Sequence, residues 1–192
     1  MDRPYTTRFD EAVAFAVAEF REVFRKATGV PYISHLFSVT ALVAEHGGDE
    51  DQMIAAMLHD WLEDIDGSAP QVLRDRWGDR VADLVIALTD SNEQPKPPWR
   101  ERKERYLAHL HHASDDVKLI SAADKLHNCR MIRRDLAMHG PRVFQWFRGE
   151  QVGTLWYYES VVTALEDGWS HPILVALRHE VEGLHADAAS GS

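Results

Sequence analysis

The sequence has little of what secreted, membrane-spanning or nucleic-acid-binding proteins depend on. One of its 192 residues is cysteine, Cys129, so a framework of intramolecular disulfide bonds is excluded. The N-terminal segment MDRPYTTRFDEA lacks the apolar core of a signal peptide, and no apolar run approaches the length needed to span a bilayer. A net charge of −10 argues against a nucleic acid or an anionic membrane as partner. We therefore expect a cytoplasmic protein.

What the chain does contain is a pattern of helices. Hydrophobic residues make up 45% of it, enough for one substantial core, and they recur at spacings of three and four. Helices are expected at residues 9–24, 33–46, 50–66, 69–77, 79–89, 99–113, 117–138, 154–166 and 172–185, with Asp49 as the N-cap of the third. Three prolines predict a loop at 90–98, either a lid or a plain connection. The expected architecture is all-α, with one domain over residues 1–185 and a disordered tail at 186–192.

The most informative stretch is MLHDWLED, residues 57–64. Its His59-Asp60 doublet is followed one helical turn later by Glu63-Asp64, and residues four apart lie on the same face of a helix. On one continuous helix, His59 and Asp60 could hold a cation while Glu63 and Asp64 lie over a bound water. The same sequence is also compatible with an ordinary helix that has a surface histidine and carboxylates in its first turn, because short motifs also arise by chance. The stretch therefore needs support from elsewhere in the chain.

Two further segments supply that support. His35 opens the apolar-periodic helix at 33–46. Asp124 lies in the apolar, small-residue stretch ISAADKLHN, where an unpaired buried carboxylate would cost several kcal/mol. An acid in that position needs a cation. Together with His59 and Asp60, these residues form a set of two imidazoles and two carboxylates drawn from three predicted helices.

The order of these residues, H…HD…D, is the pattern of the HD-domain metal phosphohydrolases. The chain also has an Arg-Lys pair at 25–26 ahead of PYISH at 31–35, then AAMLHDWLED at 55–64 and ADKLHN at 123–128. With these motifs in this order, it resembles the hydrolase domain of the RelA/SpoT alarmone enzymes, and in particular the stand-alone small alarmone hydrolases. The resemblance covers most of the chain and implies a single HD-domain helical bundle.

The resemblance also implies a role for each matching residue. The expected roles are one Mn²⁺ held by His35, His59, Asp60 and Asp124, action on the attacking water by Glu63 and Asp64, and contact with the nucleotide through Arg25, Lys26, Asn128 and a tyrosine, Tyr158 in preference to Tyr157. The chain departs from the family pattern at Leu36, Trp61-Leu62 and Ser121, where the family often has proline, a valine pair and lysine. The shape of the substrate pocket is therefore expected to differ.

The chemistry of the residues agrees with this assignment. A mixed nitrogen and carboxylate set without thiolate suits Mn²⁺ better than structural Zn²⁺, although ligand type alone leaves zinc and iron open. A bound divalent cation lowers the pKa of water and polarises a phosphoryl oxygen, and Glu63 is near enough in the sequence to take a proton. Lysines 96 and 118, Arg100 and the histidines at 109, 111 and 112 are interpreted as surface residues.

The function we expect is Mn²⁺-dependent hydrolysis of the 3′-pyrophosphate of guanosine tetra- and pentaphosphate, in a protein without synthetase or regulatory domains. One alternative keeps the chemistry and changes the nucleotide, to an adenosine alarmone, a nucleoside monophosphate or the 2′-phosphate of NADPH. Another is a non-catalytic HD fold that binds a nucleotide or a partner protein. The Glu63-Asp64 pair favours the alarmone branch. Base preference and oligomeric state are left open by the sequence.

Overall fold

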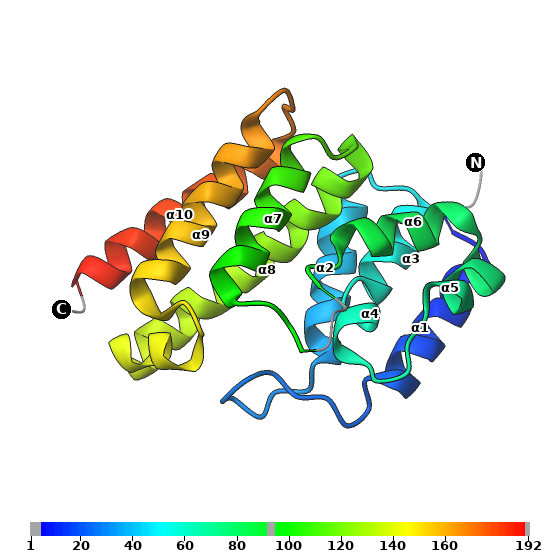
Figure 1. The fold of residues 1–192 in the computed structure, drawn as a ribbon, viewed down its shortest axis with the longest axis horizontal. Coiled ribbons are helices and arrows are strands. Elements are labelled where there is room, and N and C mark those ends of the chain that lie inside the picture. Colours follow the sequence, from blue (N-terminus) through cyan, green and yellow to red (C-terminus); the bar gives the residue numbers. More distant parts are fainter. Residues whose placement is uncertain (1–4, 92–94, 191–192) are drawn as a thin grey trace. The chain divides into compact units, whose positions relative to one another are not determined.

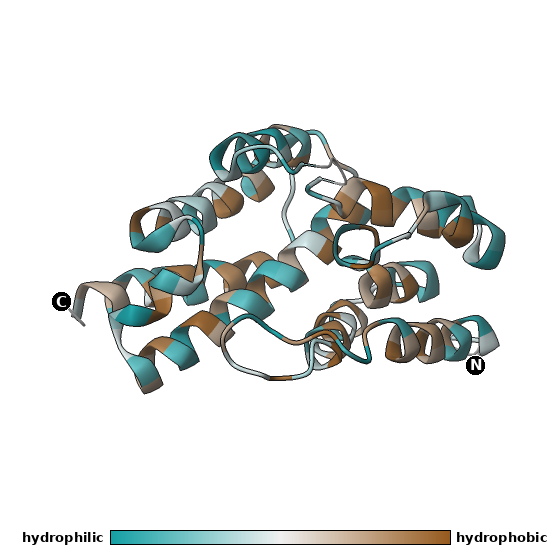
Figure 2. Ribbon diagram, turned by 60° about the horizontal axis from the view of Figure 1, so that its bottom comes forward, coloured by the Kyte–Doolittle hydropathy of each residue, from teal (hydrophilic) through white to brown (hydrophobic). Residues whose placement is uncertain are grey.

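The structure, a computed structural model, describes residues 5–91 and 95–190. Over these residues the regular secondary structure is helical, which confirms the all-α prediction. Backbone contacts divide the chain into two compact units, Met1–Asn92 and Glu93–Ser192. Most of the helices carry both hydrophobic and hydrophilic residues, as expected of helices that bury one side (Figure 2).

The first unit is built around one buried helix. Within its described residues the helices are α1 (Thr7–Glu19), α2 (Ile33–Glu45), α3 (Glu50–Leu58), α4 (Trp61–Asp64), α5 (Pro70–Trp77) and α6 (Asp79–Leu88) (Figure 1). Helix α3 packs against α1, α2 and α6, and its residues from Gln52 to Leu58 are all buried. A side chain at the C-terminal end of α3 is therefore held by packing on several sides.

Helix α3 begins as the sequence predicts and ends earlier. The side chain of Asp49 accepts a hydrogen bond from the backbone N–H of Gln52, and the Gln52 side chain accepts one from the backbone N–H of Asp49, so the predicted N-cap is confirmed as a capping box. The helix stops at Leu58, and Asp60 has φ −98° and ψ 1° before α4 starts. The prediction of one continuous helix over residues 50–66 is therefore wrong.

Helix α4 is anchored to α1 by Trp61. The indole Nε1 of Trp61 donates to Oε2 of Glu19 over 2.8 Å, and its ring lies edge-on to Phe15 with centroids 5.3 Å apart. Glu19 is also the last residue of α1, which ends five residues before the predicted end. The aromatic residue at 61 thus fixes the short helix that carries Glu63 and Asp64.

The second unit packs its longest helix between others. Within its described residues it contains α7 (Trp99–His111), α8 (Asp115–His139), the 3₁₀ helix η1 (Pro141–Trp146), α9 (Glu150–Glu166) and α10 (Pro172–Ser190). Helix α8 contacts α10, α9 and η1, while α7 lies on α9. The ring of Trp99 rests on Gly149 and Gly153, where an added Cβ at Gly149 would come within 2.7 Å of the indole. Close packing of α7 on α9 therefore needs glycine at that position.

Two segments of the second unit differ from expectation. Helix α9 begins at Glu150, one turn earlier than predicted. Helix α10 continues to Ser190 and buries Ala188, so residues 186–190 are helical where a disordered tail was expected. The last two residues of that predicted tail lie outside the described part of the chain, as do residues 92–94 of the predicted loop. Within the described ranges, no helix combines the length and hydropathy that a membrane span requires.

Candidate metal centre

His59 lies at the break between α3 and α4, and a hydrogen bond to the backbone orients its ring. Its Nδ1 lies 2.7 Å from the backbone carbonyl oxygen of Ala56. Because a carbonyl oxygen can only accept, Nδ1 must carry a proton, and in the neutral ring Nε2 then presents a lone pair. The same bond satisfies one of the last carbonyls of α3, which a helix end leaves without a partner in the helix. The way α3 ends therefore selects the tautomer of His59.

Three side chains of the first unit converge on one point. The Oδ2 atom of Asp60 lies 3.0 Å from Nε2 of His59 and 3.6 Å from Nε2 of His35. The two imidazole rings are edge-to-face with centroids 5.2 Å apart, and both side chains are buried. His35 is placed by the first turn of α2, and the other two residues by the break after α3.

This arrangement fits a divalent metal ion. With Nδ1 of His59 protonated, a neutral ring would direct the Nε2 lone pair at a carboxylate oxygen 3.0 Å away, and two acceptors at that distance repel. A cation shared by the three side chains removes the repulsion. Histidines that bind metals usually donate their other ring N–H to a carboxylate, a backbone carbonyl or water, as His59 does to Ala56. The residues present therefore suit a metal bound through nitrogen and oxygen atoms.

Glu63 and Asp64 follow the convergence point within one turn of backbone. The carbonyl oxygen of Asp60 accepts from the backbone N–H of Glu63 over 3.2 Å and from that of Asp64 over 2.9 Å. These bonds tie the start of α4 to the residue that carries the carboxylate. The side chain of Glu63 is half-buried and that of Asp64 is exposed, so Glu63 is the more enclosed of the two acids.

Arg25 and Lys26 lie in a folded-back loop directly before α2. The backbone N–H of Arg25 donates to the Val30 carbonyl over 2.8 Å, and Phe24 and Pro31 form an antiparallel bridge. Arg25 is half-buried and Lys26 is exposed. The loop returns the chain to the start of the helix that carries His35.

In the second unit, Asp124 is buried in the middle of α8 and both of its carboxylate oxygens are engaged. Oδ2 accepts a hydrogen bond from Nζ of Lys125 and Oδ1 accepts one from the side-chain amide of Asn128. Burial alone would lower the pKa of Lys125, but the Asp124 carboxylate together with the hydroxyl groups of Tyr157 and Tyr106 outweighs that effect and raises the pKa well above its usual value. Lys125 is thus an ion-pair partner of Asp124.

The two candidate tyrosines of α9 are both buried. Burial raises the pKa of the Tyr157 hydroxyl well above its ordinary value, with the charge of Lys125 opposing that rise. Among the described residues, the Tyr157 hydroxyl has no hydrogen-bond partner. Burial does not distinguish Tyr157 from Tyr158, so the preference for Tyr158 stays a prediction.

Lys118 and His111, both interpreted as surface residues from the sequence, meet at the end of α9. The Lys118 side chain is buried, and its Nζ donates to the backbone carbonyl oxygen of Asp167 over 3.0 Å. Nδ1 of the more exposed His111 lies 3.1 Å from the Asp167 carboxylate. Because Lys118 is buried, its interpretation as a surface residue is wrong. Its positive charge stabilises the C-terminal end of α9.

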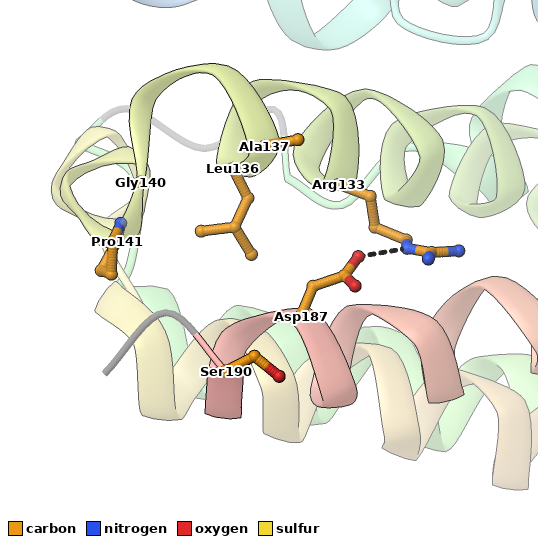
Figure 3. Close-up of a pocket in the computed structure, with 7 residues that line it drawn as sticks. All are labelled: Arg133, Leu136, Ala137, Gly140, Pro141, Asp187 and Ser190. Carbon is orange, nitrogen blue, oxygen red and sulfur yellow. Dashed lines mark hydrogen bonds and ion pairs between the residues drawn. The ribbon is translucent and has the colours of Figure 1, made fainter.

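A groove of about 510 Å³ lies between the ends of α8 and α10, and Figure 3 shows its lining. Arg133 and Asp187 form an ion pair of 2.7 Å at its edge, and Leu136 supplies an apolar surface. The lining includes none of the sequence-predicted site residues. The sequence motifs at residues 25–35, 55–64 and 123–128 therefore lie outside this groove.

Comparison with known proteins defines the class. A sequence model of the HD domain family matches residues 12–155, which is more than half of the chain. The chain therefore belongs to the HD domain family.

Its relatives narrow the assignment. The chain is 36% identical over 127 residues to the guanosine-3′,5′-bis(diphosphate) 3′-pyrophosphohydrolases MESH1 of Mus musculus and of Homo sapiens, a match that covers 65% of this chain and 69% of each relative. It is 34% identical over 130 residues to the corresponding hydrolase of Aquifex aeolicus, covering 67% of this chain and 18% of that one. These relatives confirm the resemblance of the motifs to the alarmone hydrolases.

Solved structures agree with the sequence comparison. A metazoan orthologue of SpoT that hydrolyses ppGpp has a TM-score of 0.78 at 25% identity, covering 95% of this chain and 98% of that one. A protein of Listeria monocytogenes has a TM-score of 0.72 at 25% identity, covering 79% of this chain and 99% of that one. The fold of the chain is thus that of the HD-domain hydrolases.

Proposed function

We propose that the protein is a metal-dependent hydrolase that removes the 3′-pyrophosphate from ppGpp and pppGpp and leaves GDP or GTP. The observation that carries the proposal is the convergence of Nε2 of His35 and Nε2 of His59 on Oδ2 of Asp60, with His59 in the tautomer that a metal ligand requires. The choice of substrate is supported by the names of the relatives, which are 3′-pyrophosphohydrolases of guanosine bis(diphosphate). The sequence expectation of a cytoplasmic protein belongs to the same proposal.

The proposed ligands are His35, His59 and Asp60 from the first unit, with Asp124 completing the set from the second. Asp124 is supported by the order of the motifs, in which it is the second aspartate of the H…HD…D pattern. Mn²⁺ is the metal we propose, because the set combines imidazole and carboxylate without thiolate. When bound, such a cation lowers the pKa of a water molecule and polarises a phosphoryl oxygen.

The other residues act on the water and the substrate. Glu63 takes a proton from the attacking water, and Asp64 orients it. The water oxygen bonds to the phosphorus next to the ribose 3′ oxygen, the bond between that phosphorus and the 3′ oxygen breaks, and the 3′ oxygen takes up a proton. In the proposal, Arg25 and Lys26 bind the nucleotide through charge-assisted hydrogen bonds, together with Asn128 and Tyr158.

A panel of substrates tests the proposal. Purified full-length protein with Mn²⁺ is offered ppGpp, pppGpp, ppApp, NADPH and nucleoside monophosphates, with Asp60→Ala as the inactive control. We expect pyrophosphate from ppGpp and pppGpp with wild type and none with the variant. Turnover confined to NADPH or to a monophosphate would contradict the assigned substrate. Metal-loaded protein inactive on every compound would point to a non-catalytic nucleotide-binding module.

A further inference from the structure

We propose that Tyr32 is a positioning residue, which orients the carboxylate of Asp60 for the metal ion. The inference rests on the proposed metal site and adds a residue to it. The side-chain hydroxyl of Tyr32 donates a hydrogen bond of 2.5 Å to Oδ2 of Asp60, across 28 positions in the sequence. This is the same oxygen on which His35 and His59 converge.

The ring of Tyr32 is held from several sides. It stacks on the buried ring of Phe20, with centroids 5.6 Å apart and an interplanar angle of 13°. It also meets the ring of His35 nearly at right angles, with centroids 5.4 Å apart. The backbone N–H of Tyr32 donates to the Val23 carbonyl over 2.9 Å. A tyrosine fixed in this way presents its hydroxyl at a defined point.

The hydroxyl can fix the direction of the Asp60 carboxylate because of how a carboxylate oxygen bonds. Each such oxygen offers two lone-pair sites. If one site of Oδ2 accepts the Tyr32 proton, the second is available on the side where the two Nε2 atoms lie, 3.0 and 3.6 Å away. Asp60 is the residue that most needs this support, since it lies at the break between two helices and its side chain is about 20% exposed.

Tyr32 therefore controls metal affinity without touching the metal. Loss of a partner that orients a metal ligand typically costs about 10- to 100-fold in metal affinity or activity. Replacement by phenylalanine keeps the stack on Phe20 and removes the hydroxyl alone. A hydroxyl that serves only the packing of the fold would lower thermal stability and leave the affinity for metal unchanged.

The test compares wild type, Tyr32→Phe and Tyr5→Phe as full-length, metal-free proteins. Tyr5→Phe is the matched control, because it removes one hydroxyl from an exposed tyrosine of the same unit that packs on Phe9. Binding of Mn²⁺ to each metal-free protein is measured by calorimetry. Co²⁺ is added to the metal-free proteins in place of Mn²⁺, and its visible d–d absorption reports the geometry of the ligands. Thermal melts in EDTA measure the stability of each metal-free protein.

We expect Tyr32→Phe to bind Mn²⁺ about 10- to 100-fold more weakly and to change the Co²⁺ absorption, with Tyr5→Phe equal to wild type. Equal Mn²⁺ affinity in Tyr32→Phe and wild type would overturn the role of Tyr32 and leave the metal site standing. A lower melting temperature in EDTA with an unchanged Co²⁺ spectrum would also overturn it, in favour of a packing role. Wild-type protein that binds no Mn²⁺ would overturn both the inference and the proposed function.

Discussion

The side chain of His59 closes the end of its own helix by donating Nδ1–H to the carbonyl of Ala56, 2.7 Å away. That bond leaves Nε2 as the atom that faces Asp60. His59 is thus both the C-cap of α3 and a proposed metal ligand. Replacing His59 should consequently affect both the helix end and the metal site, whereas replacing the proposed general base Glu63 should affect turnover alone.

His59→Ala and Asp60→Ala should each lose both metal and activity, because each removes a proposed ligand. Glu63→Ala should keep its metal and lose turnover by about 10²- to 10⁴-fold, the usual contribution of a positioned general base. Metal content by mass spectrometry and pyrophosphate release are measured on the same samples. If Glu63→Ala lost its metal, the proposed division of roles between α4 and the residues before it would be wrong.

Arg25→Ala and Lys26→Ala should weaken substrate binding and leave the metal content unchanged. A hydrogen bond to a charged group contributes about 1.5–3 kcal/mol, so kcat/KM should fall by about 10- to 100-fold, mainly through KM. Arg100→Ala is the control for the loss of an arginine charge, because Arg100 has no proposed contact with the nucleotide. Arg100 is exposed, and its guanidinium carbon lies 3.2 Å from the centroid of the Trp156 ring. Arg25→Ala and Lys26→Ala proteins with wild-type kinetics would place the pair on the solvated surface.

Lys125→Met should destabilise the metal-free protein. The ammonium is an ion-pair partner of the buried Asp124 carboxylate, and breaking a buried pair by removing one member typically costs about 3–5 kcal/mol. Urea unfolding in EDTA measures the loss, with the exposed Lys26→Met as a control for the loss of a lysine charge. A Lys125→Met protein as stable as the control would mean that the Lys125 charge does little to support the buried acid.

Removal of the metal should lower the stability of the wild-type fold. Ligand binding to the native state adds about 2.7 kcal/mol at a hundredfold excess over the dissociation constant. Wild-type protein should therefore melt at a higher temperature with Mn²⁺ than with EDTA. Asp124→Asn removes the charge and keeps the shape, so its melting temperature should respond little to Mn²⁺. A full wild-type response in Asp124→Asn would remove Asp124 from the ligand set.

Much of the helical pattern was predictable from periodicity and capping residues, because these are local properties of the chain. Asp49 is an example, since its side chain needs only Gln52 to form the predicted capping box. The break at His59 was not predictable from spacing. The letters HDWLED are compatible with a continuous helix, and the bond from the His59 ring to its own backbone leaves no mark on the sequence pattern.

Contacts between residues far apart in the chain were also not predictable from the sequence. The link from Tyr32 to Asp60 depends on how α2 packs beside the end of α3, and in the sequence Tyr32 is only one letter of a motif. The C-terminal segment was misjudged for a different reason. Its small and polar residues are typical of a disordered tail, but alanine favours helix, and α10 contacts α8 and buries Ala188.

In the proposed function, His35, His59 and Asp60 bind a metal ion that serves hydrolysis of a 3′-pyrophosphate. The most direct measurement follows ppGpp by ³¹P NMR with metal-stripped full-length protein, before and after addition of Mn²⁺. We expect no change in ppGpp without metal, and GDP with one equivalent of pyrophosphate once Mn²⁺ is present. Turnover that persists in the verified absence of metal, or orthophosphate as the first product, would contradict it.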